Sequence, residues 1–161
     1  TMKLYVVRHG AADDLAPSMQ DFDRALTEKG RKRTREVGKA LRHASAVPRV
    51  VLSSPLVRAL QTAEILQSSF DPDRPVIARR ELAPGADLRA LAVELASSGA
   101  PDAMIVGHEP DLSDFVYALL GGPLTRPFLK SMVVCLQLDR HGRTAKLDFV
   151  LDPKSLEIER S

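Results

Sequence analysis

The chain has 161 residues, of which 44% are hydrophobic and 27% are charged, and its formal net charge is +2. These values are typical of a folded domain, exclude a disordered chain and argue against broad nucleic-acid binding. No apolar run approaches the roughly 18 residues that a membrane span needs, so we expect no contact with a membrane. The length suits one domain covering residues 1–161, and we expect it to be a monomer.

Apolar segments with strand-like and helix-like spacing alternate along the chain. In order, they predict a strand at 3–7, a loop at 11–26, a helix from Thr27 to about His43, a strand at 50–53, a helix that begins at Ser54, a short strand at 76–78, a helix at 87–97, a strand at 103–106, a helix from Pro110 to 120, and strands at 132–139 and 144–151. A turn containing Gly142 makes the last two strands an antiparallel pair. We therefore expect a three-layer α/β/α fold whose sheet is mostly parallel with an antiparallel edge.

Two of the predicted helices have recognisable starts. Thr27 can cap the first helix, although Gly30 weakens its first turn. Ser54 has the character of an N-cap and Pro55 that of a first helical residue, so we expect the second helix to begin there.

Histidine and arginine side chains follow three of the predicted strands. The first strand ends at Arg8, His9 and Gly10, the second at Ser53 with Arg58 on the first turn of the next helix, and the fourth at His108. The carboxyl ends of parallel strands meet at one edge of a sheet, where ligands bind. Two arginines, two histidines and the N-termini of the following helices make that edge suitable for a phosphate group. Gly10 allows the backbone to turn away tightly, so that a substrate can approach His9.

The sequence has no motif for a cofactor or a metal. It contains no Gly-x-x-x-x-Gly-Lys-Ser/Thr loop for a nucleoside triphosphate, and no Cys/His cluster or His-Glu-x-x-His with metal-ligand spacing. We therefore expect no cofactor and no metal. The single cysteine, Cys135, lies in the apolar run 132–136, which indicates a buried structural thiol. One cysteine also excludes an internal disulfide and favours a reducing, cytoplasmic location.

Three motifs resemble those of the histidine phosphatase superfamily. They are Arg8-His9-Gly10, the segment Ser53-Ser54-Pro55-x-x-Arg58-Ala59-x-x-Thr62-Ala63, and Gly107-His108. The short chain and the segments 23–27 (Asp-Arg-Ala-Leu-Thr) and 107–110 (Gly-His-Glu-Pro) are most similar to the SixA-type phosphohistidine phosphatases of that superfamily. The resemblance covers residues 3 to about 120 and implies a phosphoglycerate mutase-like fold.

The resemblance implies a role for each matching residue. His9 would be the nucleophile that transiently carries the phosphoryl group, and Arg8, Arg58 and His108 would hold its oxygens. Positioned cations suit this reaction because charge spreads over three equatorial oxygens. The neighbouring arginines should keep His9 neutral, whereas His108, which faces the bound anion, is expected to be protonated.

Gly10, Arg24 and Ser53 complete the expected phosphate-binding set. Arg24 is equally suited to contact the phosphate or to pair with Asp21 or Asp23, and the sequence leaves both interpretations open.

One segment departs from the pattern of the superfamily. Many members carry Leu-x-Glu after the third strand, and that Glu protonates the leaving oxygen, but here Pro84 takes its place in Leu82-Ala83-Pro84. Glu81 remains a possible acid. An alkoxide leaving group needs a proton, since water itself has a pKa of about 15.7, whereas imidazole, with a pKa of about 6.5, can leave without a dedicated acid. The missing Glu therefore favours phosphohistidine over alkyl phosphate esters.

The function predicted from these residues is hydrolysis of phosphohistidine on a protein of the histidine-phosphotransfer type, through a covalent intermediate on His9. Between Glu81 and Pro101 there is room for one short helix and no large lid, and an open site suits a protein substrate. The alternatives are a broad-specificity phosphatase for small phosphate esters and a non-catalytic phosphoprotein-binding module.

The first helix carries a basic series on one face: Arg31, Arg35, Lys39 and Arg42. Such a series is either a solvated face or a docking patch. Nucleic acid is not an expected partner, because aromatic residues make up only 4% of the chain and tryptophan is absent, so no stacking platform accompanies the charges.

Overall fold

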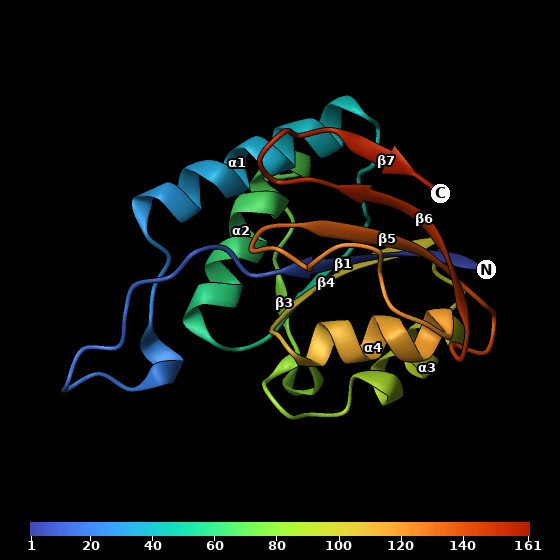
Figure 1. Ribbon diagram of the computed structural model, residues 1–161, viewed down its shortest axis with the longest axis horizontal. Helices are drawn as coiled ribbons and strands as arrows, with labels where there is room; N and C mark the ends of the chain where they lie inside the picture. The colour runs from blue at the N-terminus through green and yellow to red at the C-terminus, as the bar shows by residue number, and fades with distance from the viewer.

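The computed structural model of residues 1–161 has a seven-stranded sheet between two pairs of helices (Figure 1). The strands are β1 (Met2–Arg8), β2 (Val51–Ser53), β3 (Ile77–Ala78), β4 (Asp102–Gly107), β5 (Val133–Leu138), β6 (Ala145–Leu151) and β7 (Ile158–Arg160). The helices are α1 (Glu28–His43), α2 (Val57–Phe70), α3 (Leu88–Ser97) and α4 (Asp111–Leu120), with short 3-10 helices η1 (Asp21–Asp23) and η2 (Arg80–Leu82). None of the helices has the length and hydrophobicity needed to cross a bilayer.

The sheet is half parallel and half antiparallel. Its strand order is β3-β2-β4-β1-β5-β6-β7, in which β3, β2, β4 and β1 run parallel and β5, β6 and β7 each run antiparallel to the strand before them. Strand β7 was not predicted. It is only three residues long, too short to show a strand period, and its pairing with the end of β6 creates it.

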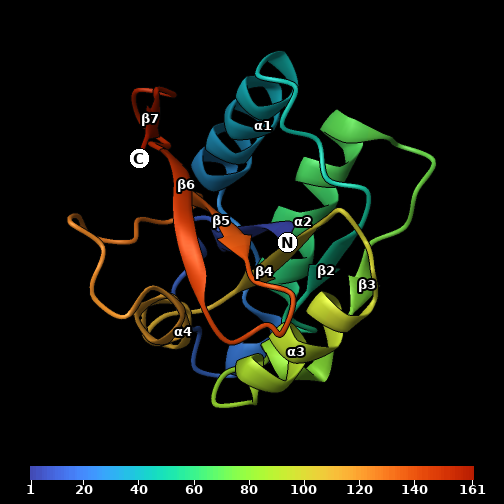
Figure 2. The same cartoon turned by 90° about the vertical axis from the view of Figure 1, so that its right-hand side faces the viewer.

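Strand β1 is buried on both faces because its side chains alternate between two cores. Leu4 and Val6 pack in the core that α3 and α4 cover, whereas Tyr5 and Val7 pack in the core that α1 and α2 cover. Figure 2 shows the two helix pairs on opposite sides of the sheet. This arrangement confirms the expected α/β/α fold, and it puts the carboxyl end of β1 near the middle of one sheet edge.

The predicted helix starts have different outcomes. The Thr27 hydroxyl accepts a hydrogen bond from the N–H of Gly30, so the predicted cap of α1 is confirmed. Helix α2 begins at Val57 with Leu56 as its N-cap, so the predicted start at Ser54 and Pro55 is wrong. The Ser54 oxygen instead accepts from the N–H of Leu56 (3.2 Å) in a turn before the helix, because a serine oxygen can serve a turn as well as a cap.

Gly30 allows α1 to begin close to the backbone that follows His9. The carbonyl of Ala11 accepts a hydrogen bond from the N–H of Thr27 (3.0 Å), and a Cβ on Gly30 would overlap that same carbonyl oxygen. A backbone atom cannot rotate away as the end of a flexible side chain can. The glycine that weakens the first helical turn therefore permits the contact that holds α1 against the loop behind the site.

We predict that Gly30→Ala destabilises the protein. The substitution improves helix propensity by about 1 kcal/mol, but overpacking against the Ala11 carbonyl costs about 1–3 kcal/mol and displaces the chain after His9. Chemical denaturation should therefore show a lower free energy of unfolding. Gly122→Ala is the matched control, because a Cβ at Gly122 meets nothing within 4 Å. Equal stability of the two variants would contradict the prediction.

Candidate functional site

The carboxyl ends of β1 and β4 open into a pocket of about 450 Å3. Its lining consists of Arg8, His9, Ala12, Asp21, Arg24, Arg58, Pro84, His108, Glu109 and Lys130. The structure thus brings together the four residues expected to be catalytic and Arg24, which was expected to bind the phosphate or to pair with an aspartate. Two strand ends, the loop 11–26, α2 and the loop before β5 all contribute, so the pocket forms only when distant parts of the chain meet.

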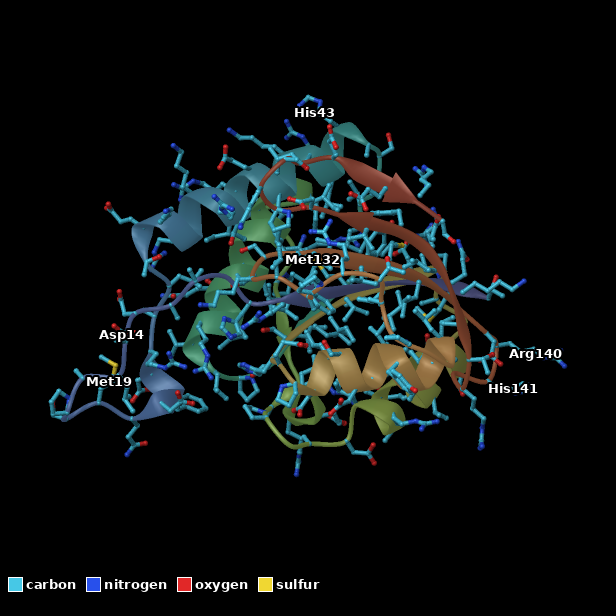
Figure 3. All side chains as sticks on the ribbon, in the orientation of Figure 1. Asp14, Met19, His43, Met132, Arg140 and His141 are labelled. Atoms are coloured by element: carbon cyan, nitrogen blue, oxygen red, sulfur yellow. The ribbon has the colours of Figure 1, made fainter.

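Pairing of β1 with β4 places the two histidines side by side. Arg8 lies opposite Gly107 in the parallel register, so the next residue on each strand is a histidine. The ring centroids of His9 and His108 are 5.1 Å apart. The other two histidines lie elsewhere: Figure 3 shows His43 at the end of α1, and His141 in the turn between β5 and β6, across the molecule from the loop that carries Asp14 and Met19.

The His9 imidazole is buried and held in one tautomer. Its Nδ1 lies 2.7 Å from the carbonyl oxygen of Gly10, and because a carbonyl only accepts, Nδ1 carries the proton. In the neutral ring Nε2 then has a free lone pair. Burial lowers the pKa of His9 to about 4; the bond to Gly10 opposes this shift, and the charges of His108, Arg58 and Arg8 add to it. The neutral state was expected, but burial is a larger cause than the arginines.

His108 is also buried and has a low pKa in the protein alone, so its protonation beside a bound anion stays a prediction. Burial, followed by the charge of Arg58, lowers the pKa of His108 to about 4. Its Nε2 lies 2.7 Å from the hydroxyl oxygen of Ser54, which already accepts from the N–H of Leu56. When the Ser54 hydroxyl donates to Nε2, the proton of neutral His108 lies on Nδ1.

Asp21 holds both pocket arginines that come from outside β1. Arg58 donates from Nη1 to the Asp21 carbonyl (2.9 Å) and from Nη2 to its carboxylate (3.2 Å). Arg24 donates from Nε to the other carboxylate oxygen (2.9 Å). Partial desolvation raises the pKa of Asp21, but the charges and hydrogen bonds of Arg58 and Arg24 together lower it by more. The pKa is therefore below its ordinary value, and the carboxylate is ionised. Arg24 thus pairs with Asp21 while it lines the pocket.

The site contains buried donors without partners. Five buried side-chain polar atoms in the protein have no hydrogen-bond partner, and three of them are Arg8 Nε, Arg58 Nε and His108 Nδ1. Buried polar groups are normally paired. Their concentration on three of the four expected catalytic residues fits a site that receives an anion with several acceptor oxygens.

Gly10 and Ser53 support the pocket from outside its lining. The N–H of Gly10 donates to the Thr62 hydroxyl (3.0 Å), which in turn donates to the Arg58 carbonyl (2.8 Å). A Cβ on Gly10 would lie 3.0 Å from the hydroxyl oxygen of Ser131, so the glycine is needed for packing there. The Ser53 hydroxyl donates to the backbone carbonyl of the next residue (2.9 Å). The structure brings neither residue to the place expected for the phosphate.

Glu81 is turned away from the pocket into an ion-pair network. Its carboxylate accepts from Arg79 Nη2 (2.8 Å), and the same guanidinium binds Glu94 (2.6 Å). The hydrogen bond from Arg79 lowers the pKa of Glu81, which makes it a poor proton donor. Pro84 does line the pocket, so the position of the expected acid near the site carries no titratable group.

Sequence reasoning missed the positions of Glu109 and Lys130 in the pocket lining. The Glu109 carboxylate accepts from the N–H (2.9 Å) and the hydroxyl of Ser113, one helical turn later. Lys130 precedes β5, and an antiparallel strand begins at the edge where its parallel neighbours end, so its place in the chain was a usable signal. No group of three or more His, Cys, Asp or Glu side chains is arranged to hold a metal ion.

We predict that His9 and His108 stay neutral to about pH 5 when no anion is added, because their pKa values are about 4. Imidazole NMR signals, assigned with His9→Asn and His108→Asn, should not titrate between pH 8 and pH 5.5. The unfolded chain binds more protons than the folded one between about pH 4 and 6.5, so the free energy of unfolding should fall as the pH is lowered through that window. An NMR midpoint near pH 6.5 would contradict this.

We predict that Asp21→Asn strengthens binding of inorganic phosphate by about 3- to 10-fold, because the variant loses a carboxylate that competes for two arginines. Calorimetric titration at low ionic strength measures the affinity. Asp23→Asn is the control, since Asp23 lies in the same 3-10 helix and forms no ion pair. An equal gain in both variants would show that net charge alone is responsible.

Comparison with known proteins identifies the family of this fold and pocket. The sequence model of the histidine phosphatase superfamily (branch 1) matches residues 4–83. An uncharacterized protein of Picosynechococcus sp. is 41% identical over 75% of this chain and 74% of its own length. The phosphohistidine phosphatase SixA of Escherichia coli (strain K12) is 24% identical over 99% of both chains. The structure of the protein histidine phosphatase SixA complexed with tungstate superposes with a TM-score of 0.87 at 26% identity, and covers 97% of this chain and 100% of the other. The chain therefore belongs to the histidine phosphatase superfamily.

Proposed function

We propose that this protein hydrolyses phosphohistidine on a protein through a covalent phosphoryl intermediate on His9. Membership of the histidine phosphatase superfamily supports a phosphatase, and the SixA relatives support phosphohistidine as its substrate. The observation that carries the proposal is the His9 imidazole, whose proton is held on Nδ1 by Gly10 in a pocket with three arginines. That tautomer exposes the basic nitrogen that a nucleophile needs.

In the first step, Nε2 of His9 uses its lone pair to form a bond to phosphorus. The substrate ring carries a proton on its other nitrogen, so when the bond between phosphorus and the substrate nitrogen breaks, the ring keeps the electron pair and leaves as neutral imidazole. Arg8, Arg58 and His108 would stabilise the charge on the three equatorial oxygens. The unpartnered donors Arg8 Nε, Arg58 Nε and His108 Nδ1 support this role, because phosphoryl oxygens can accept from them.

In the second step, water attacks the phosphoryl group on His9. The bond between phosphorus and Nε2 breaks, inorganic phosphate leaves, and the lone pair returns to the His9 ring. The proton stays on Nδ1 throughout, where it is donated in a hydrogen bond to the Gly10 carbonyl. His9 is therefore regenerated in the tautomer in which it began.

The carboxylates in the pocket favour a substrate that leaves without a proton donor. Asp21 is held ionised by two arginines, and Glu109 already accepts two hydrogen bonds from Ser113. Neither is arranged as a general acid, and Glu81 pairs with Arg79 elsewhere. An imidazole leaving group tolerates this arrangement, whereas an alkoxide does not.

We predict that the rate on a histidine-phosphorylated phosphotransfer protein exceeds the rate on sugar phosphates by about 100-fold or more, since a general acid contributes typically that much to the leaving of an alkoxide. Parallel assays with the phosphoprotein, an aryl phosphate and several sugar phosphates measure kcat/KM for each. Sugar phosphates as the best substrates would support the broad-specificity alternative instead.

We predict that His9→Ala lowers kcat/KM by roughly 1,000-fold or more, because no other nucleophile is available to form the intermediate. Quenching the wild type in alkaline detergent, where the N-phosphoryl bond is stable, during turnover of a ³²P-labelled substrate should trap label that is lost in His9→Ala. Glu81→Gln serves as the comparison and should stay within about twofold of wild type. Unlabelled wild type, together with tight binding of the phosphoprotein, would indicate a binding module.

A further inference from the structure

A second pocket, of about 440 Å3, adjoins the candidate active site. The two share Arg8 and Lys130, so they lie on either side of the same two side chains. The remaining lining comes from the N-terminal half of α1, the loop before β5 and the loop between β6 and β7: Ala11, Lys29, Gly30, Arg33, Leu129, Ser131, Pro153 and Lys154. We call it the basic pocket.

The charge of the basic pocket is uncompensated. Its lining contains five cationic residues and no acidic one. Lys29, Arg33, Lys130 and Lys154 form no ion pair, whereas other surface cations such as Arg79 do. Clustered cations without counter-charges repel one another and produce a positive potential that attracts anions.

The carboxylate nearest to Lys154 in the sequence does not relieve this charge. Asp152 lies two residues before Lys154, but its carboxylate accepts from Arg126 (2.6 Å) and from the backbone N–H groups of 154 and 155. These contacts, the Arg126 bond above all, lower the pKa of Asp152 to about 2. In the loop between β6 and β7, the Asp152 carboxylate is thus already paired and Lys154 is exposed.

The basic pocket is distinct from the basic series noted in the sequence. Arg35, Lys39 and Arg42 line a separate hollow between α1 and α2, and none of them lines the candidate active site. Only the first turns of α1, with Lys29 and Arg33, reach the basic pocket. Helix α1 therefore offers two groups of cations, one beside the site and one remote from it.

The surroundings of the site favour a protein as the ligand. Lys29, Lys130 and Lys154 are exposed on three separate segments, so the pocket receives groups from a surface. The loop 11–26, which also lines the candidate active site, exposes three large apolar side chains: Leu15 (53%), Met19 (38%) and Phe22 (45%). Figure 1 shows this loop projecting from the body of the molecule. Exposed apolar residues and cations around one phosphate pocket suit a partner with a broad contact surface.

We propose that the basic pocket binds acidic side chains that lie next to the phosphohistidine on the surface of the phosphorylated partner. Arg8 and Lys130, shared by both pockets, then contact the phosphoryl group and the neighbouring carboxylates together. This inference deepens the proposed function: it states that the enzyme selects its protein substrate by acidic residues around the phosphorylated histidine.

The test compares two peptides that carry a non-hydrolysable triazole phosphonate analogue of phosphohistidine, one flanked by glutamates and the other by glutamines. Fluorescence anisotropy at low salt should show about 10-fold tighter binding of the acidic peptide to the wild type. The double variant Lys29→Glu/Lys154→Glu should lose this preference, and added salt should weaken it. Binding of the glutamine peptide should change much less.

The matched control is Arg35→Glu/Lys39→Glu, which alters the net charge equally at the remote end of α1 and should keep the preference for the acidic peptide. The inference is overturned if the wild type shows no preference, or if both double variants lose it alike. Tighter binding of tripolyphosphate than of the acidic peptide, with the same dependence on Lys29 and Lys154, would also overturn it by assigning the pocket to a small polyanion.

These outcomes are separate from those for the proposed function. Hydrolysis of phosphoramidate that depends on His9 reports the catalytic site, and it should persist in both double variants, which also shows that they fold. Persistent hydrolysis without any peptide preference would refute the basic pocket alone. A peptide preference without hydrolysis of any phosphohistidine substrate would refute the catalytic proposal alone.

Discussion

The pocket depends on a buried positive charge, that of Arg58. A guanidinium with a side chain only 6% exposed is costly unless acceptors surround it, and the protein meets this cost with the backbone and carboxylate of Asp21. The same charge lowers the pKa values of both site histidines, after the larger effect of burial. One arginine on the first turn of α2 therefore favours neutral imidazoles, holds a loop in place and offers an anion a strong partner.

Asp21 differs from the other members of the pocket because it is the carboxylate that pairs with two of the pocket arginines. Its carboxylate side chain is 56% exposed, and it bridges two arginines with the two-oxygen geometry that a phosphoryl group also presents. The pocket is thus assembled around an anion that the chain itself supplies. A phosphoryl group that binds Arg58 and Arg24 would therefore compete with this carboxylate for both arginines.

The residues at the strand ends could be predicted from the sequence, because the hydrophobic pattern shows where each strand lies and where it ends. A buried β1 must end at Arg8 and His9, parallel pairing must bring His108 alongside, and a helix after β2 must carry Arg58 at its start. The fold class follows from the same alternation of strands and helices. These features need only local pattern and the rules of sheet topology.

The remaining features depend on contacts that no local pattern contains. The three residues of β7 are a strand only because β6 pairs with them. The low pKa of His108 in the protein alone comes mainly from burial. The Glu81 carboxylate pairs with Arg79, which lies just before the 3-10 helix η2. Lys130 reaches the site, and Lys154 the basic pocket beside it, from loops more than a hundred residues after His9. Such placements require the whole fold.

Thr62 links the backbone next to His9, the proposed nucleophile, to the backbone of Arg58. Its hydroxyl receives the N–H of Gly10 and donates to the carbonyl of Arg58, so the residue after His9 and the residue that binds the anion share one rigid link. Residues of loop 11–26 other than Asp21 and Arg24 can then vary, to suit one partner or another, without altering this link. The specificity of such an enzyme can diverge in its loops while its chemistry stays constant.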